Sequence, residues 1–94
     1  MSVARVVSFK GKEGGGDAVL GWLKPAVEHI IDAPGCEGMS LFRDPENPDT
    51  ILSIEQWDIR ESHHKFLAAM SEADMAKANS TMTGPPEGVF YDPV

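Results

Sequence analysis

Four segments of the chain alternate apolar and polar side chains with a period of two, which is typical of β-strands. These segments are residues 3–10, 36–44, 50–58 and 89–92. Both faces of the first segment carry apolar residues, since Val7 and Phe9 alternate with Ala4 and Val6. We therefore expect both faces of the sheet to be at least partly covered.

Two other segments repeat apolar residues at intervals of three and four, which predicts helices over residues 18–32 and 60–70. Asp17 is the expected N-cap of the first helix. Pro25 predicts a kink or a break there, because it removes a backbone donor and crowds the carbonyl of Gly21. The expected core stripe of this helix is Leu20, Leu23, Val27, Ile30 and Ile31. One or two further helical turns are expected over residues 72–79.

The order strand, helix, strand, strand, helix, strand predicts an α+β fold of the ferredoxin-like βαββαβ type. Its four-stranded antiparallel sheet would carry the helices on one face, within a single domain over residues 1–94. The other face is too apolar to remain exposed, so we expect a homodimer joined through the sheet. This uncovered face is one of two alternating sets: Arg5, Phe9, Met39, Leu41 and Trp57, or the residues between them.

Charge and hydropathy exclude some partners. The net charge is −7 and the eight Lys and Arg residues are scattered, so nucleic acid and anionic membranes are not expected to bind. No stretch approaches the roughly 18 apolar residues of a transmembrane helix. The first residues lack the apolar core of a secretory signal, so we expect a cytoplasmic protein.

The candidate chemistry lies where the third strand meets the second helix, at Glu55, Trp57, His63 and His64. His63 falls on the apolar face of the helix, whereas His64 points about 100° away from it. The two imidazoles therefore diverge, and no third residue has the spacing of a metal ligand, so no metal site is expected. An alternative is that His63 is a hydrogen-bonded packing residue and Trp57 is core.

Three sequence stretches resemble the antibiotic biosynthesis monooxygenase (ABM) superfamily of dimeric α+β barrels. They are Ala33-Pro-Gly-Cys-Glu-Gly38, Leu41-Phe-Arg-Asp-Pro-Glu46, and Ile54-Glu-Gln-Trp-Asp58 followed by Arg60-Glu61 and a short helix. The resemblance covers nearly the whole chain. It implies homodimers with facing sheets and small-molecule pockets between sheet and helices. Some members oxidise anthrones or quinols without metal or flavin, and others degrade haem.

Some positions depart from the family pattern. Haem-degrading relatives use an Asn, a Trp and a His where this chain has Val7 or Ser8, Phe66 and Ala76. Many members also carry a His at the position of Phe66, one turn beyond His63. Trp57 does match the family's tryptophan on the third strand. The resemblance therefore argues against haem degradation and transfers no catalytic His residue by residue.

Two functions follow from these observations. The first is a cofactor-independent monooxygenase for a small aromatic substrate of the quinol or polyketide type, with His63 as the base. The residues expected to bind that substrate are Trp57, Glu55, Arg43, Met39, Trp22 and Phe42. The second is a non-catalytic dimeric module of the same fold that binds a small molecule or serves as an accessory subunit.

Overall fold

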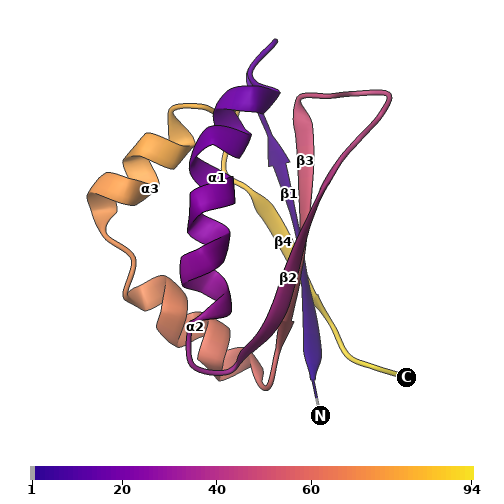
Figure 1. Cartoon of the computed structure of the whole chain (residues 1–94), viewed down its shortest axis with the longest axis vertical. Coiled ribbons are helices and arrows are strands. Elements are labelled where there is room, and N and C mark those ends of the chain that lie inside the picture. Colours follow the sequence, from indigo (N-terminus) through magenta and orange to yellow (C-terminus); the bar gives the residue numbers. More distant parts are fainter. Residues whose placement is uncertain (1) are drawn as a thin grey trace.

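The computed structural model describes residues 2–94 and confirms the ferredoxin-like α+β fold (Figure 1). Its elements are β1 (Val3–Lys10), α1 (Gly16–Ile31), β2 (Cys36–Arg43), β3 (Thr50–Trp57), α2 (Arg60–Ala68), α3 (Glu72–Asn79) and β4 (Glu87–Tyr91). All neighbouring strands are antiparallel, in the order β2-β3-β1-β4. The helical turns expected over residues 72–79 form α3, which is separate from α2; Ser71 caps α3 by accepting a hydrogen bond from the Asp74 amide at 3.1 Å.

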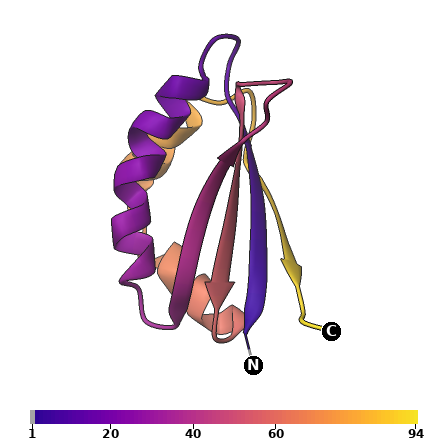
Figure 2. The ribbon, with the colours of Figure 1, turned by 45° about the vertical axis from the view of Figure 1, so that its right-hand side comes forward.

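All three helices lie on one face of the sheet, and the opposite face is open (Figures 1 and 2). The register pairs Val3 with Trp57 and Phe9 with Ile51, so the odd-numbered residues of β1 and β3 share a face. That face is the covered one, since Phe9, Ile51 and Trp57 are all buried. The open face is therefore the alternate set, in which Phe42 and Val89 are more than half exposed.

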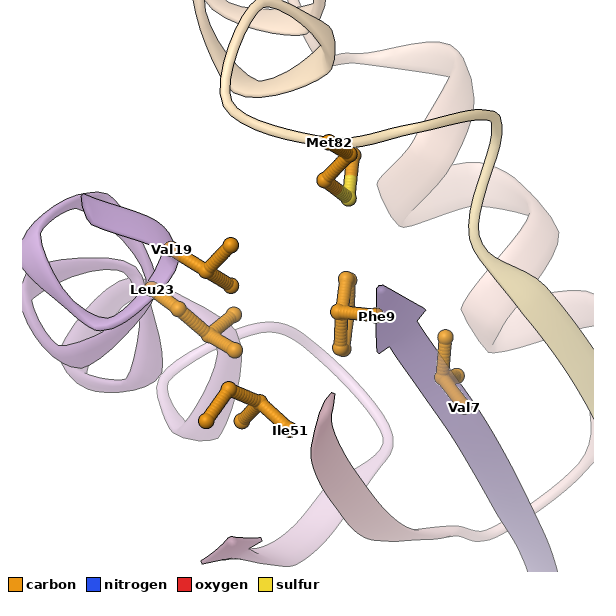
Figure 3. Packing of buried hydrophobic residues seen from close by; sticks show 6 residues of the cluster. All are labelled: Val7, Phe9, Val19, Leu23, Ile51 and Met82. Atoms are coloured by element: carbon orange, nitrogen blue, oxygen red, sulfur yellow. The ribbon is translucent and has the colours of Figure 1, made fainter. Parts of the chain in front are cut away.

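The apolar core lies between α1 and the sheet (Figure 3). Its buried members are Val7, Phe9, Val19, Leu23, Ile51 and Met82. Val19 and Leu23 point from α1 toward the strands, and Met82 approaches from the chain segment before β4 (Figure 3). We call these six residues the apolar cluster.

The start of α1 differs from the prediction, because Asp17 is not its N-cap. The helix begins at Gly16, and the cap residue Gly15 makes no side-chain hydrogen bond. Asp49 takes over the capping role from another part of the chain, since its carboxylate accepts hydrogen bonds from the Gly14 and Gly16 amides at 2.9 and 3.0 Å. A Cβ at Gly16 would overlap the Pro48 carbonyl, so this close approach requires glycine.

Of the kink or break predicted at Pro25, the break does not occur, because α1 runs continuously through this residue. Pro25 and Gly21 both lie on the exposed side of the helix, where water can solvate the carbonyl that loses its donor.

The buried residues of α1 differ from the predicted core stripe at both ends of the helix. Val19 is fully buried although it was not predicted, and Ile31 is 44% exposed. Within residues 2–94, no helix is long and apolar enough to cross a membrane.

Candidate functional site

The turn between β3 and α2 fixes the start of α2. The Asp58 carboxylate accepts hydrogen bonds from the Ser62 hydroxyl at 2.6 Å and the Ile59 amide at 2.7 Å. These two bonds, the Ser62 bond first, lower the pKa of Asp58. The Asp58 amide donates to the carbonyl of Gly35 at 2.8 Å. Gly35 has a φ of 90°, and a Cβ there would overlap Asp58 and Ser62, so the turn requires glycine.

This turn directs His63 onto the sheet among aromatic rings. The His63 side chain is only 5% exposed, whereas His64 lies on the solvent side as predicted. The His63 ring packs edge-on against Trp57 at 5.5 Å between centroids and against Phe90 at 5.3 Å. Its buried Nδ1 has no hydrogen-bond partner within residues 2–94. His63 therefore presents an unused polar atom inside an aromatic environment.

Glu55 lies buried beside Trp57 and is occupied by hydrogen bonds. The indole Nε1 of Trp57 donates to Oε1 of Glu55 at 2.9 Å, and the Ser53 hydroxyl donates to Oε2 at 3.4 Å. Burial raises the pKa of Glu55, and the Trp57 bond, the charge of Arg5 and the Ser53 bond oppose that rise. Glu55 is thus an acceptor that holds the indole in place.

Arg5 completes the site from the neighbouring strand. It pairs with Glu55 across β1 and β3, and its guanidinium carbon lies 4.6 Å from the centre of the Phe90 ring. A Cβ at Gly88 would overlap this guanidinium, so glycine provides the space for it. The buried Nε of Arg5 has no hydrogen-bond partner in the described part of the chain. We call Arg5, Glu55, Trp57, His63 and Phe90 the polar cluster.

The electrostatics of the polar cluster keep His63 neutral. Burial, followed by the charges of Arg5 and His64, lowers the pKa of His63 to about 4. A neutral imidazole is able to accept a proton from an acidic hydroxyl group. A nearby guanidinium stabilises the oxyanion that such a transfer leaves. The arrangement therefore places an uncharged proton acceptor beside a cation; the lowered pKa makes His63 a weaker base, and an oxyanion formed next to it would raise that pKa again.

The structure brings together three residues of the predicted site, His63, Trp57 and Glu55. A fourth, Met39, is paired with Glu55 across β2 and β3 and is partly buried against the apolar cluster. Sequence reasoning did not include Arg5 among the site residues. A usable signal existed, because an antiparallel pairing of the first and third strands can place the charges of Arg5 and Glu55 opposite one another.

Three predicted substrate-binding residues lie elsewhere. Trp22 packs edge-on against Phe9, six positions along β1 from the end that pairs with Trp57. Arg43 lies at that same far end, in an exposed ion pair with Asp17 at 2.7 Å. Phe42 is 52% exposed on the open face of the sheet, because alternation directs it away from Met39 and Leu41. The structure therefore places these three residues apart from the polar cluster.

A groove of about 510 Å³ lies on the other side of α2, between that helix and the end of α1. Its lining includes His29, Asp32, Gly35, Asp58, Lys65 and Phe66. Phe66 connects the groove to the polar cluster, since its ring lies 6.0 Å from that of Trp57. In the described residues, no three His, Cys, Asp or Glu side chains come together as a metal site.

Comparison with known proteins identifies relatives over most of the chain. The family model "Antibiotic biosynthesis monooxygenase" matches residues 2–78. The solved structure of a "putative Antibiotic biosynthesis monooxygenase" from Chloroflexus aurantiacus J-10-fl is 27% identical, with a TM-score of 0.80, over 100% of this chain and 94% of that one. None of the curated proteins matches the chain.

Two more distant structures share the fold. The structure of a putative antibiotic biosynthesis monooxygenase from Nitrosomonas europaea is 18% identical, with a TM-score of 0.85, over 100% of this chain and 99% of that one. A mutant of SnoaB, a cofactor-independent oxygenase from Streptomyces nogalater, is 15% identical, with a TM-score of 0.79, over 98% of this chain and 92% of that one. At these identities the similarity establishes the fold alone.

Proposed function

The chain belongs to the antibiotic biosynthesis monooxygenase family, and on that premise we propose that it oxidises a small aromatic substrate with molecular oxygen and without a cofactor. The substrate class is a quinol or polyketide-like phenol, and His63 is the base. One observation carries the proposal: a buried, neutral His63 presents an unpartnered Nδ1 among Trp57, Phe90 and the charged Arg5.

The reaction is balanced for a phenol that carries a ring methylene, as an anthrone does. His63 removes a proton, and the resulting carbanion-like anion gives electrons to oxygen and forms a C–O bond. The imidazolium returns its proton to the peroxide. Loss of the remaining C–H proton together with hydroxide leaves a carbonyl and water. The carbon loses four electrons and oxygen gains four, so no other reductant is needed.

Each residue of the polar cluster has a role in this proposal. Arg5 stabilises the substrate anion, and Trp57 and Phe90 supply an apolar surface for an aromatic ring. Glu55 holds the indole of Trp57 through the 2.9 Å hydrogen bond. The low pKa of His63 favours the neutral base before substrate binds, and an adjacent substrate anion then favours its protonated form.

Oxygen consumption with a panel of hydroquinones and anthrones tests the proposal. We expect His63→Ala to reduce the rate by roughly 100-fold or more, the usual contribution of a general base. His64→Ala is the matched control, because this neighbouring imidazole is exposed, and we expect its rate to stay within about twofold of wild type. Absence of uptake with every substrate would contradict the enzyme function. An unchanged rate in His63→Ala would remove His63 from it.

A second candidate function is a non-catalytic binding module. It is favoured by the 510 Å³ groove beside α2, whose lining does not include His63. Saturable binding of aromatic ligands without any oxygen consumption would favour this function over the monooxygenase. Loss of that binding in Lys65→Glu, but not in His63→Ala, would place the ligand in the groove.

We further propose that a second copy of the chain covers the open face of the sheet. Phe42, Val89 and Tyr91 on that face are 52%, 51% and 56% exposed, and an apolar face of this kind is typical of an interface. Analytical ultracentrifugation should give a dimer for wild type and a monomer for Ile54→Glu. Leu67→Glu is the control on the helical side and should remain dimeric. A wild-type monomer at micromolar concentration would contradict the proposal.

A further inference from the structure

We propose that Arg5 binds a negatively charged oxygen of the ligand, so that the site selects aromatic molecules carrying an acidic hydroxyl or a carboxylate. The inference deepens the proposed function, because it concerns the same site and names the substrate class more narrowly. It is a statement about binding, however, and binding is measurable without turnover. The two proposals can therefore fail separately.

The first observation is that Arg5 faces a carboxylate without being bonded to it: its charge opposes the rise in the pKa of Glu55, but no ion pair joins the two side chains. No ion pair joins Arg5 to any acidic side chain among residues 2–94, and its buried Nε has no acceptor. Glu55 lies opposite Arg5 across the strands, and the hydrogen bonds that its two oxygens accept come from Trp57 and Ser53 and not from Arg5. A buried donor without an acceptor is unfavourable, and a ligand oxygen would satisfy it.

The second observation is that the guanidinium is held in place. It lies over the Phe90 ring at 4.6 Å and occupies the space above Gly88 that a side chain would fill. An arginine fixed in this way loses little further conformational freedom when it binds an anion. Arg5 as a residue is only partly buried, although its Nε is buried.

A nearby arginine provides an internal comparison. Arg60 also lies over the Phe90 ring, at 5.3 Å, but it is paired with the Asp92 carboxylate at 3.3 Å. Two arginines thus contact one ring, and only Arg60 has an acidic partner in the described part of the chain. The anion-binding role is therefore assigned to Arg5 and not to the aromatic ring or to positive charge in general.

The third observation concerns His63. The rings of His63 and Phe90 are 5.3 Å apart, so the imidazole and the Arg5 guanidinium both contact Phe90. The unpartnered Nδ1 of His63 is buried as well. A ligand with a charged oxygen and a neighbouring hydroxyl on an aromatic ring would supply partners for both buried nitrogens. This chemistry is that of hydroxyaromatic acids and of acidic polyhydroxylated aromatics.

Titration calorimetry with two probes tests the inference. Hydroxynaphthoate is an anion at neutral pH, and naphthol is its neutral counterpart. We expect wild type to bind hydroxynaphthoate more tightly than naphthol, and Arg5→Met to weaken hydroxynaphthoate binding by at least about tenfold. Naphthol affinity should stay within about twofold in Arg5→Met. Arg5→Lys keeps the charge and should recover part of the affinity for hydroxynaphthoate.

Arg60→Met is the matched control, and it should change both affinities by less than about threefold. The inference is overturned if wild type does not prefer hydroxynaphthoate, or if Arg5→Met and Arg60→Met weaken its binding equally. Arg5-dependent binding without oxygen consumption would support this inference and contradict the proposed oxygenation. Oxygen consumption that requires His63, together with hydroxynaphthoate binding that is unaffected in Arg5→Met, would support the proposed oxygenation and contradict the anion-binding role of Arg5.

Discussion

The apolar cluster and the polar cluster are built on the same face of the same two strands, yet their chemistry is opposite. Toward one end of β1 and β3, Phe9 and Ile51 pack against helix α1. Toward the other end, Arg5 and Glu55 occupy equivalent inward positions. The apolar cluster contains no side-chain nitrogen or oxygen, whereas both unpartnered buried nitrogens of the described chain belong to the polar cluster.

The residues that stabilise the fold and the residues suited to chemistry therefore lie toward opposite ends of the same two strands. Buried apolar side chains stabilise the fold through the hydrophobic effect, while unpartnered buried polar atoms oppose folding. Nothing in the strand geometry requires the polar residues, since the neighbouring positions show that apolar ones are accommodated. Function is the usual reason for keeping such groups buried. The comparison predicts that truncation destabilises the apolar cluster, whereas apolar replacement stabilises the polar one.

The largest expected effect is the loss of stability on truncation in the apolar cluster. Leu23 is 2% exposed, so Leu23→Ala should lower the free energy of unfolding by about 2–5 kcal/mol through lost burial and a residual cavity. Leu67→Ala is the matched control, because Leu67 is 42% exposed on α2, and it should cost less than about 1 kcal/mol. Urea denaturation measures both. Equal losses would remove the distinction between core and surface.

The second prediction concerns pH and His63. Its pKa is about 4 in the folded protein against 6.5 for the free side chain, so the unfolded state takes up the proton first as pH falls. The stability that a neutral His63 contributes is therefore complete above pH 6.5 and is lost as pH falls toward 4. The charges that act on His63 are those of Arg5 on β1 and His64 on α2.

The stability difference between wild type and His63→Phe isolates this contribution from the other acidic and basic groups. Denaturant titrations between pH 4 and 7 should show the difference changing in favour of wild type as pH rises, by at most about 3 kcal/mol. Above pH 6.5 the difference should be constant. A difference that does not vary with pH would mean that His63 is as easily protonated in the folded state as in the unfolded one.

The third prediction is a substitution of a buried residue that raises the free energy of unfolding, whereas most such substitutions lower it. At neutral pH, His63→Phe should raise the free energy of unfolding by about 1–2 kcal/mol, because it removes a buried unpartnered nitrogen and keeps an aromatic ring beside Trp57 and Phe90. The same variant should lose oxygen consumption. A destabilised His63→Phe would show that the imidazole contributes to packing and would weaken the contrast between the clusters.

The sequence predicted the fold well because alternation and helical spacing determine which faces are buried. It also placed His63 correctly, since the phase of α2 is a local property of residues 60–70. It did not identify the contact between Arg5 and the site, because that contact depends on which residues of the first and third strands pair, and Arg5 is opposite Glu55 only in the observed register. A local pattern does not encode this information.

Three predicted substrate-binding residues, Trp22, Arg43 and Phe42, lie apart from Trp57 because chemical type alone does not indicate distance along a strand or the face of the sheet. Arg43 pairs with Ile51, six positions along β3 from Trp57, and at about 3.3 Å per residue that separation is close to 20 Å. Alternation alone was sufficient to exclude Phe42, whose side chain lies on the face opposite that of Met39 and Leu41.

The smallest expected effect is that of Glu55→Gln, which tests whether the buried carboxylate serves as an acceptor or as a charge. The amide oxygen of glutamine can still accept from Trp57 Nε1, so stability at neutral pH should change by only about 1 kcal/mol. The raised pKa of Glu55 means that the unfolded state ionises first as pH rises above 4.5. Wild type therefore loses stability from Glu55 over that range, and the variant should gain relative to it.

Titration calorimetry on Glu55→Gln then separates Glu55 from Arg5. If the charge of Arg5 is free for ligand in wild type, removing the neighbouring carboxylate should leave hydroxynaphthoate affinity within about threefold. A larger gain would mean that Glu55 already neutralises Arg5 in the absence of ligand. The polar cluster would then be a satisfied charge pair, and its contrast with the apolar cluster would rest on His63 alone.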